Sequence, residues 1–567
     1  MRHDAAAPSV LILGAGINGA CVARELALNG VGVVIVDRHD IATGATAKSS
    51  RLIHGGLRYL EYGDIGLVRE SLNERARLLR LAPQFVRPLR LHIPVGRRTG
   101  GLIQAAFRFV KLNRIAASFP FSAGRGLWAV RIGLWMYDRL AASDATQRYA
   151  VNRVGATNSP AVDPEQYRWL CSYSDAQILA PERFVVALLA DAQQAARDRG
   201  VRCDVLTRHA AVMENGEVRV APLDEDDGEA EMLRPATIVN ATGASGDRTL
   251  SELGAKSGRL FGGTKGSHVI THHRGLREAL GEDGVYAETA DGRLVFVLPF
   301  GEGVLIGTTD VRVETNPLQV AASRQEIEYL LEMVNAVFQG VAVGPHDVTA
   351  HYCGVRPLPY VSTGKTGAIP RGHSIVSGRA ASIPIDTLVG GKLTTCREFG
   401  EVAADRILRR LGIPRTANTR DRVIPGGTDY PANEDLLQER LRSVATRAGW
   451  SVGQAAAVWE LIGTRLDEIA DSFATGPSES IPGTQIPQSF VDWSIRHEGP
   501  RTLEDLIERR LMLAWNCNLS PRTIRSLASC LIETGHLQKA DVESEVTRTL
   551  RRLEQHYGRR LRDAENR

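Results

Sequence analysis

The chain has few cysteines for its length, and their spacing suggests no joint role. Seven are spread over 567 residues, at positions 21, 171, 203, 353, 396, 517 and 530. The odd count and the lack of paired spacing argue against a disulfide framework and against a zinc site, and they are typical of a reducing compartment. We therefore expect neither disulfides nor a metal centre.

Long apolar runs are also absent. Residues 1–8 lack the apolar core of a signal peptide, and no run of about 18 apolar residues exists to span a bilayer. The net charge of +4 is nearly balanced and gives no reason to expect nucleic-acid binding. At about 150 residues per domain, the length suggests roughly three or four folding units. We expect a cytoplasmic protein, or one held peripherally at the inner face of the cell membrane.

The N-terminal stretch predicts a turn that binds a dinucleotide. The apolar run Val10–Leu13 leads into GAGING, followed by a helical pattern and a second apolar run that ends at Asp37. In this order, Gly14 allows a tight turn, Gly16 lets the backbone approach a pyrophosphate, and Gly19 lets the helix pack on the strand. Asp37 is then placed to accept a hydrogen bond from a ribose hydroxyl.

The segment after this unit is rich in hydroxyl groups and glycines. It reads TGATAKSSRLIHGGLRYLE from Thr43 to Glu61. Such a composition is typical of a loop that lines a ligand through backbone and hydroxyl contacts.

Joined to the glycine turn, the run SSRLIHGGLRYLEYGD resembles the FAD-dependent, quinone-linked glycerol-3-phosphate dehydrogenases. Five further motifs match in the same order: KGSH at 265–268, LIGTTD at 305–310, GVRPL at 354–358, GGKLTT at 390–395 and IRHEGPRTLEDLIERR at 495–510. Ordered motifs that cover nearly the whole chain are far more specific than any one of them alone. The resemblance implies FAD as the cofactor.

The patterns between the motifs predict an α/β fold with a discontinuous, Rossmann-like FAD-binding domain. A helical period at 184–199, strands at 201–206 and 218–222, and a buried strand ending in Ala241-Thr242-Gly243 return the chain to the dinucleotide. We expect this domain to comprise residues 1–71, 152–250 and 355–428.

The remaining residues predict two further regions. Residues 72–151 and 251–354 form an α+β substrate cap close to the membrane, in which alternation at 285–312 predicts an antiparallel sheet. Helical spacing at 453–471, 503–514 and 521–533 predicts an all-helical C-terminal domain at 429–567.

The loop Gly390–Thr395 precedes a helical stretch, so its backbone donors are expected to face the flavin pyrimidine ring, where negative charge collects on reduction. The residues that we expect to bind FAD are Gly14, Gly16, Asn18, Gly19, Asp37, Thr46, Ser49, Ser50, His54, Gly55, Gly56, Thr242, Gly243, Gly391, Lys392, Leu393 and Thr394.

Oxidation of an alcohol by a flavin needs a group that takes the hydroxyl proton and cations that hold an anionic substrate. The resemblance implies that the substrate is bound by Arg58, Tyr59, Thr308, Arg356, Arg371 and Lys392. The planar fork of arginine suits phosphate, since two parallel charge-assisted bonds fix its position and orientation.

The catalytic candidates are Arg356, His54 and His268. For His54 two roles stay open, a proton acceptor or a hydrogen-bond partner of the flavin. His268 is likewise either a base or a structural hydrogen bonder.

These expectations combine into one function, the FAD-dependent oxidation of sn-glycerol 3-phosphate to dihydroxyacetone phosphate with electrons passed to a quinone. Three alternatives stay open: a dehydrogenase of another polyol phosphate such as erythritol phosphate, an oxygen-using oxidase, and a flavin-binding sensor without turnover. A homodimer is also left open.

Local charge is strongly uneven in one interval. Between Glu74 and Asp138 there is no acidic residue, yet twelve basic ones occur, interleaved with aromatic residues. At 102–115, cations such as Arg108, Lys111 and Arg114 and apolar residues are expected on opposite faces of a helix, as in helices that lie in a lipid headgroup layer. The alternative is a cap whose aromatics form a core and whose arginines are solvated. The resembled family is known for peripheral membrane association.

Overall fold

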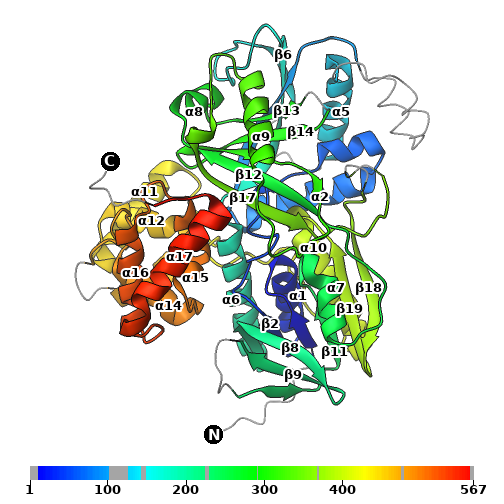
Figure 1. Cartoon of the computed structure of the whole chain (residues 1–567), viewed down its shortest axis with the longest axis vertical. Helices are drawn as coiled ribbons and strands as arrows, with labels where there is room; N and C mark the ends of the chain where they lie inside the picture. The colour runs from blue at the N-terminus through cyan, green and yellow to red at the C-terminus, as the bar shows by residue number, and fades with distance from the viewer. Residues whose placement is uncertain are drawn as a thin grey trace.

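The computed structural model describes residues 10–100, 125–141, 148–223, 229–289, 292–364, 366, 369–473 and 478–561. Three regions can be followed in Figure 1. The N-terminal strands lie in a lower region, a second sheet lies above them, and the C-terminal helices, coloured yellow to red, form a group at one side.

A six-stranded sheet contains the N-terminal turn. Its strands, in order across the sheet, are β18 (His373–Ala380), β19 (Ile383–Gly390), β11 (Thr237–Asn240), β1 (Val10–Leu13), β2 (Val33–Asp37) and β7 (Cys203–Thr207). All neighbours are parallel except the edge pair β18–β19. Helix α1 (Ile17–Leu28) connects β1 to β2, which confirms the predicted strand–turn–helix–strand unit.

Both faces of this sheet are covered, which explains why its strands are continuously apolar rather than alternating. Successive side chains of a strand point to opposite faces. Val10 and Ile12 pack with helices α1, α6 (Pro181–Arg199) and α10 (Cys396–Leu411). Leu11 and Leu13 pack instead against a three-stranded antiparallel sheet. Its strands are β8 (His209–Glu214), β9 (Glu217–Pro222) and β10 (Glu231–Leu233).

The second large sheet holds the predicted antiparallel strands of the cap. Along its main path the order is β16 (Val311–Arg312), β12 (Thr264–Thr271), β15 (Gly303–Gly307), β14 (Leu294–Phe300), β13 (Gly284–Glu288), β4 (Val86–Val95), β6 (Trp169–Ile178) and β3 (Leu52–Ile53), with β17 (Val348–Arg356) paired to β12 and β5 (Ala150–Arg153) paired to β6. The pair β13–β4 is parallel, so this sheet is mixed rather than purely antiparallel.

Segments that are distant in sequence form this sheet together. Residues 152–250 were expected in the FAD-binding domain, but β6 within them pairs over its whole length with β4. That segment therefore contributes to both sheets. The limits of the three domains remain a prediction.

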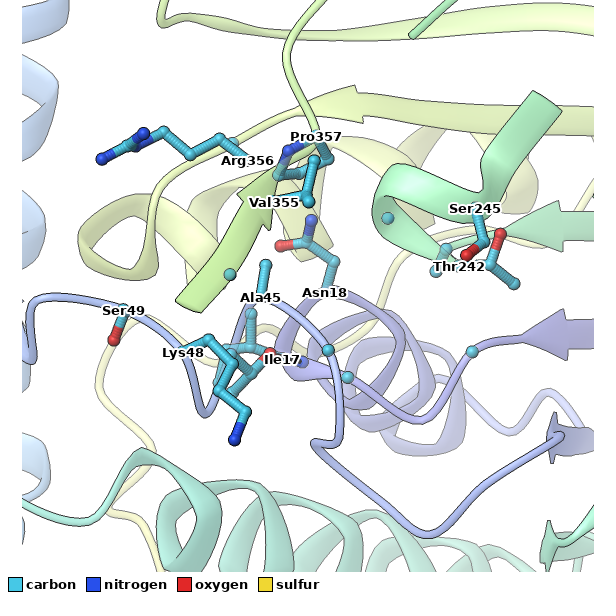
Figure 2. Close-up of a pocket in the computed structure, with 18 of the residues that line it drawn as sticks. Ile17, Asn18, Ala45, Lys48, Ser49, Thr242, Ser245, Val355, Arg356 and Pro357 are labelled. Carbon is cyan, nitrogen blue, oxygen red and sulfur yellow. Dashed lines mark hydrogen bonds between the residues drawn. The ribbon is translucent and has the colours of Figure 1, made fainter. Parts of the chain in front are cut away.

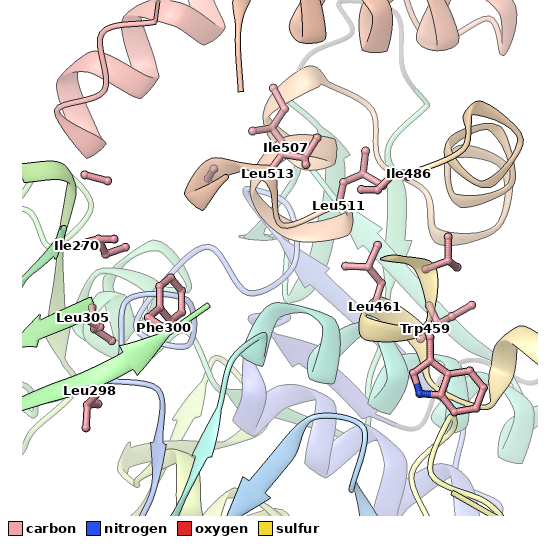
Figure 3. Close-up of a cluster of buried hydrophobic side chains, with 14 of the residues drawn as sticks. Ile270, Leu298, Phe300, Leu305, Trp459, Leu461, Ile486, Ile507, Leu511 and Leu513 are labelled. Carbon is pink, nitrogen blue, oxygen red and sulfur yellow. The ribbon is translucent and has the colours of Figure 1, made fainter. Parts of the chain in front are cut away.

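The two faces of the second sheet have different partners. Helices α8 (Arg274–Leu280) and α9 (Arg324–Val337) cover one face, where Val285 and Val297 are buried. Helices α2 (Ile65–Leu81) and α5 (Leu127–Leu140) pack on the other face, in a core that continues into the C-terminal helices. Figure 3 shows Leu298 and Phe300 of the sheet in the same cluster as Trp459 and Leu511.

The C-terminal region is helical, as predicted. Its helices are α11 (Glu434–Ala448), α12 (Val452–Ile462), α13 (Arg465–Ile469), α14 (Gln488–Glu498), α15 (Leu503–Asp505), α16 (Pro521–Glu533) and α17 (Val542–Tyr557). Helix α7 (Gly246–Glu252) and the short helices Leu57–Tyr62, Gly243–Ser245, Pro345–Asp347, Leu393–Thr395, Ala470–Phe473, Leu506–Arg510, Leu513–Trp515 and Lys539–Asp541 complete the described helices. Within the described residues, no helix combines the length and the apolar character needed to cross a bilayer.

Buried ion pairs join the C-terminal region to the six-stranded sheet. Asp40, which follows β2, accepts hydrogen bonds from Arg509 at 2.7 Å and Arg510 at 2.8 Å, and each of the three side chains is 1% exposed. Arg183 on α6 pairs with Glu498 on α14 at 2.6 Å. Burial alone would raise the pKa of Asp40. The charges and hydrogen bonds of Arg510 and Arg509 outweigh this effect and hold the pKa well below its usual value. The motif at 495–510 therefore provides an interface between regions.

Loss of the Asp40 charge should weaken this interface. Asp40→Asn removes the carboxylate that pairs with buried Arg510, while Arg509 keeps Asp505 and Glu508 as partners. We therefore expect the free energy of unfolding to fall by about 3–5 kcal/mol, measured by urea denaturation. Asp421→Asn is the matched control, because its pair with Arg80 is 80% exposed on the Asp421 side and should change stability little. Equal midpoints for the two variants would contradict the role assigned to Asp40.

Candidate functional site

A cavity of about 350 Å³ lies between the two large sheets. Residues at the carboxyl ends of four parallel strands line one side: Gly14 after β1, Asp37 of β2, Ala241 after β11 and Gly390 of β19. This is where open α/β sheets bind ligands. Figure 2 shows Asn18, Ala45, Thr242 and Val355 converging on this space from separate segments.

Most of the residues predicted from the sequence meet in this cavity. Its lining includes Gly14, Gly16, Asn18, Asp37, Thr46, Ser49, Ser50, His54, Tyr59, Thr242, Gly243, His268, Arg356, Arg371, Gly391, Lys392, Leu393 and Thr394. Five predicted residues do not line it: Gly19, Gly55, Gly56, Arg58 and Thr308. The individual roles of all these residues remain predictions.

The glycine turn has the close contacts that a pyrophosphate cradle needs. Gly14 has a φ of +105°, and a Cβ there would lie 2.6 Å from the carbonyl oxygen of Ala241. A Cβ on Gly19 would lie 2.0 Å from the carbonyl oxygen of Gly14, so Gly19 sets the approach of α1 to β1. Gly16 has no side chain to cap α1, and Thr46 Oγ1 accepts a hydrogen bond from the Ile17 N–H at 3.1 Å. The positive end of the helix dipole at this N-terminus favours an anion.

Asp37 is fixed at the end of β2. Its carboxylate accepts hydrogen bonds from the backbone N–H of Ala15 at 2.8 Å and of His39 at 2.9 Å. Burial raises the pKa of Asp37 to about 6. Near neutral pH the group is mostly ionised and acts as an acceptor, as recognition of a ribose hydroxyl requires.

The hydroxyl-rich loop is tied to the second sheet. The Tyr352 hydroxyl donates to the carbonyl oxygen of Ser49 at 2.7 Å, and Ser50 Oγ lies 2.9 Å from His268 Nε2. The His268 ring stacks on Tyr352, with 4.6 Å between the ring centres. Burial, and then Arg356, hold the pKa of His268 well below its usual value. His268 is therefore neutral at physiological pH and engaged on both its ring face and its Nε2.

His54 lies in the same cavity beside a lysine. Burial, and then Lys392, lower the pKa of His54 to about 4, so its imidazole is also neutral. Burial lowers the pKa of Lys392 to about 8. Lys392 Nζ donates to Ser71 Oγ and lies 4.8 Å from the centre of the Tyr59 ring.

Two arginines share one carboxylate at the cationic end of the cavity. Asp310 accepts hydrogen bonds from Arg356 Nη1 at 3.1 Å and from Arg371 Nη2 at 3.2 Å. Arg356 Nη2 also donates to Thr308 Oγ1 at 3.1 Å. Thr308 therefore acts on the cavity through Arg356, whereas Arg58 lies apart from the cavity, beside Tyr286.

Sequence reasoning missed several residues at this site. Asp310 ends the motif LIGTTD, and that position was the signal that could have found it. Asp310 contacts the lining residues Arg356 and Arg371. Three residues that line the cavity themselves, His39, His209 and Phe296, stand in no motif. Among the described residues, no group of three or more His, Cys, Asp or Glu side chains is arranged to hold a metal.

Comparisons with known proteins agree with this geometry. The family described as FAD dependent oxidoreductase matches residues 9–395. The fold resembles the structure of the glycerol-3-phosphate dehydrogenase from Bacillus halodurans complexed with FAD, with a TM-score of 0.69 and 17% identity, covering 97% of this chain and 95% of that one. The class is thereby defined: this is an FAD-dependent oxidoreductase, and its cofactor is FAD.

Curated relatives narrow the class to a family. The glycerol-3-phosphate dehydrogenase of Synechocystis sp. is 30% identical over 544 residues, which cover 90% of this chain and 89% of the relative. The D-erythritol 1-phosphate dehydrogenase of Brucella abortus is 32% identical over 511 residues, covering 88% and 93%. The chain belongs to the family of FAD-dependent glycerol-3-phosphate dehydrogenases.

The glycine turn gives a test of FAD binding. Gly14→Ala forces a Cβ into the backbone of Ala241 at a positive φ, and strain of about 1–3 kcal/mol should weaken FAD binding about tenfold or more. Gly32→Ala is the matched control, because the nearest atom to a Cβ there is 3.7 Å away. Bound FAD is measured after acid precipitation, which should release all of it because no covalent link is expected. Flavin left in the pellet, or full FAD content in Gly14→Ala, would contradict these expectations.

Proposed function

We propose that this protein oxidises sn-glycerol 3-phosphate to dihydroxyacetone phosphate and passes the electrons to a quinone. The observation that carries the proposal is a single cavity with a dinucleotide cradle and, elsewhere in its lining, the cations Arg356, Arg371 and Lys392. A protein that only bound FAD would have no use for this second cationic group. A flavin sensor is therefore the weaker alternative.

The two arginines differ in how much hydrogen-bonding capacity they keep for a ligand. Both terminal nitrogens of Arg356 have protein partners, namely Thr264 and Asp310 for Nη1 and Thr308 and Thr309 for Nη2. For Arg371, only Nη2 has partners within the described part of the chain. We assign the main phosphate contact to Arg371. Arg356 adds positive charge at this end of the cavity and orients Asp310.

At the carbinol end, the side chains of this chain orient the substrate and take its proton. Bound FAD supplies the acceptor for the hydride from the carbinol carbon. Lys392, held by Ser71 next to Tyr59, places positive charge where an anionic substrate needs it. His54 is neutral and therefore able to accept the hydroxyl proton. His268 is the less suited acceptor, since its Nε2 already contacts Ser50.

A second candidate substrate is D-erythritol 1-phosphate, favoured by the similarity to the Brucella abortus enzyme. The two substrates differ in chain length and share the phosphate. Steady-state rates with both compounds, each with a quinone analogue and with oxygen as acceptor, distinguish the dehydrogenase, its four-carbon counterpart and the oxidase. No turnover of any polyol phosphate would refute the proposal.

Removal of Arg371 should weaken binding of the substrate phosphate. Arg371→Ala should lower kcat/KM for the phosphorylated substrate by at least about tenfold, because a hydrogen bond to a charged group contributes about 1.5–3 kcal/mol. Weak turnover of unphosphorylated glycerol and the FAD content should hardly change. Arg312→Ala is the control, since Arg312 is an exposed cation on neighbouring β16 that donates to Val361 and Gly364. Equal losses on glycerol and its phosphate would place Arg371 at the carbinol instead.

We further propose that the enzyme attaches to a membrane through α5, which would bring its electrons close to a lipid-soluble quinone. Trp128, Ile132 and Trp135 lie at helical spacing on α5 and are 48%, 52% and 51% exposed. Arg131 and Arg139 lie over the rings of Trp128 and Trp135, at 5.0 and 5.3 Å. Aromatic and basic side chains on one helix suit a headgroup layer. The expected helix at 102–115, with Arg108, Lys111 and Arg114, lies outside the described residues.

Flotation with anionic liposomes tests this attachment. Replacing Trp128 and Trp135 by Gln should reduce the floated fraction several-fold, because each aromatic side chain that inserts buries apolar area. Leu436→Gln is the control, because Leu436 is 48% exposed on α11, away from the proposed surface. Binding should weaken with salt without vanishing, since each surface cation contributes about 1 kcal/mol. Absence of the unmodified protein from the floated fraction would refute membrane attachment and leave the dehydrogenase assignment intact.

A further inference from the structure

A buried polar group lies next to His54 and does not line the cavity. It consists of Asp175 on β6, Arg75 on α2 and Tyr137 on α5, each 1% exposed. Asp175 Oδ1 accepts hydrogen bonds from the Tyr137 hydroxyl at 2.6 Å and from Arg75 Nη1 at 2.7 Å. None of the three stands in a motif that relates the chain to its family. Burial of these polar groups is costly unless each finds partners.

This group holds one peptide unit of the cavity wall. The Gly55 N–H donates both to Tyr137 Oη at 2.9 Å and to Asp175 Oδ1 at 3.0 Å. On the other side, the Thr394 hydroxyl donates to the His54 carbonyl oxygen at 3.3 Å and lies 3.0 Å from the His54 N–H. The His54–Gly55 peptide is therefore fixed on both sides. Asp175 and Tyr137 bind its N–H, and Thr394, in the loop that carries Lys392, binds its carbonyl oxygen.

The first glycine of the HGG motif is explained by the same contact. A Cβ on Gly55 would lie 2.3 Å from Tyr137 Oη and 2.4 Å from Leu72 Cδ2. Any other residue would push the backbone away from Tyr137. Gly55 itself does not line the cavity, so its role is to let the peptide approach the buried group.

The charges of this group also reach the imidazole. Asp175 raises the pKa of His54 and Arg75 lowers it, both more weakly than burial and Lys392 do. Burial, and then Asp175, hold the pKa of Tyr137 well above its usual value, so its hydroxyl remains a donor at all working pH.

We infer that Tyr137 and Asp175 are positioning residues, which hold the His54–Gly55 peptide and thereby set the place of the His54 imidazole in the cavity. The expected effect on kcat rests on the proposed function, whereas the expected effect on the position of the His54–Gly55 peptide does not. A phenylalanine at 137 would keep the ring packing against Tyr173, whose ring centre is 5.7 Å away. The two hydroxyl contacts, to the Gly55 N–H and to Asp175 Oδ1, would be lost.

The test uses the full-length protein loaded with FAD and compares Tyr137→Phe with Tyr173→Phe as matched control. In Tyr137→Phe, amide hydrogen exchange of the segment around Gly55 should accelerate about five- to tenfold, as expected for one lost hydrogen bond. kcat should fall about 10- to 100-fold, because a small misplacement of a reacting group has that effect. KM for the phosphorylated substrate should stay within about threefold and FAD content should not change, because Tyr137 itself does not line the cavity. Tyr173→Phe should match the unmodified protein in all of these.

A second background tests whether Tyr137 acts through His54. In a His54→Ala protein, Tyr137→Phe should cause no further loss of kcat, because residues that act through one another are not additive. If Tyr137→Phe does not fold, Thr394→Val removes the hydroxyl on the other side of the same peptide and should give the same exchange pattern. Three outcomes would each overturn the inference. They are additive losses of kcat in the double variant, unchanged amide exchange around Gly55 in Tyr137→Phe, and equal effects of Tyr137→Phe and Tyr173→Phe. If the unmodified protein turns over no polyol phosphate, the proposed function fails, while the exchange measurement still decides the positioning role.

Discussion

The contact between Gly14 and Gly19 is the constraint on which the cavity depends. A Cβ on Gly19 would lie only 2.0 Å from the carbonyl oxygen of Gly14, so α1 begins directly against the end of β1. This closeness brings the N-terminus of α1 to the carboxyl edge of the sheet, where Asp37 ends β2 and Ala241 follows β11. The same edge faces the second sheet, so the glycine turn and the cations Arg356 and Arg371 line one cavity.

Charged and neutral side chains line different parts of this cavity. At the end of β2, Asp37 is a buried carboxylate that accepts backbone N–H groups. Elsewhere, Arg356 and Arg371 both pair with Asp310. The Asp310 carboxylate reduces the repulsion between the two guanidinium groups and leaves the group of three with one net positive charge. His54 and His268, which also line the cavity, are neutral because burial lowers the pKa of each imidazole. Charge is therefore concentrated where anions are expected and is absent from the imidazoles.

Two tyrosines outside the motifs, Tyr557 and Tyr137, contact residues of the cavity wall. Lys48 lines the cavity and its Nζ donates to the hydroxyl of Tyr557, at the end of α17. The Tyr557 hydroxyl in turn donates to Glu508 at 2.6 Å. Helix α5 has a similar double role, because Tyr137 contacts Gly55 while Trp128 and Trp135 face solvent. The surface proposed for the membrane and the turn that carries His54 are thus joined by a single helix.

The sequence by itself determined the local geometry and the family. The sequence order of strand, GAGING, helix and strand ending at Asp37 predicts a turn whose glycines are required by contacts within one βαβ unit. The local pattern was therefore sufficient to predict this turn. Hairpin signals at 285–312 likewise depended on neighbours along the chain, and they correspond to strands β13 to β16. The motifs also brought most of the cavity lining together, because several of them lie at the end of a strand, as GVRPL does at β17 and GGKLTT at β19.

Only the tertiary structure decided the contacts between distant segments. It placed β6 in the second sheet, put Asp310 between Arg356 and Arg371, set Tyr137 and Asp175 beside Gly55, and used the 495–510 motif as an interface. The partners in these contacts are 46 to 470 residues apart in the chain. A periodic pattern reports only neighbours within a helix or strand, whereas these positions are fixed by packing and by the need to pair buried charges.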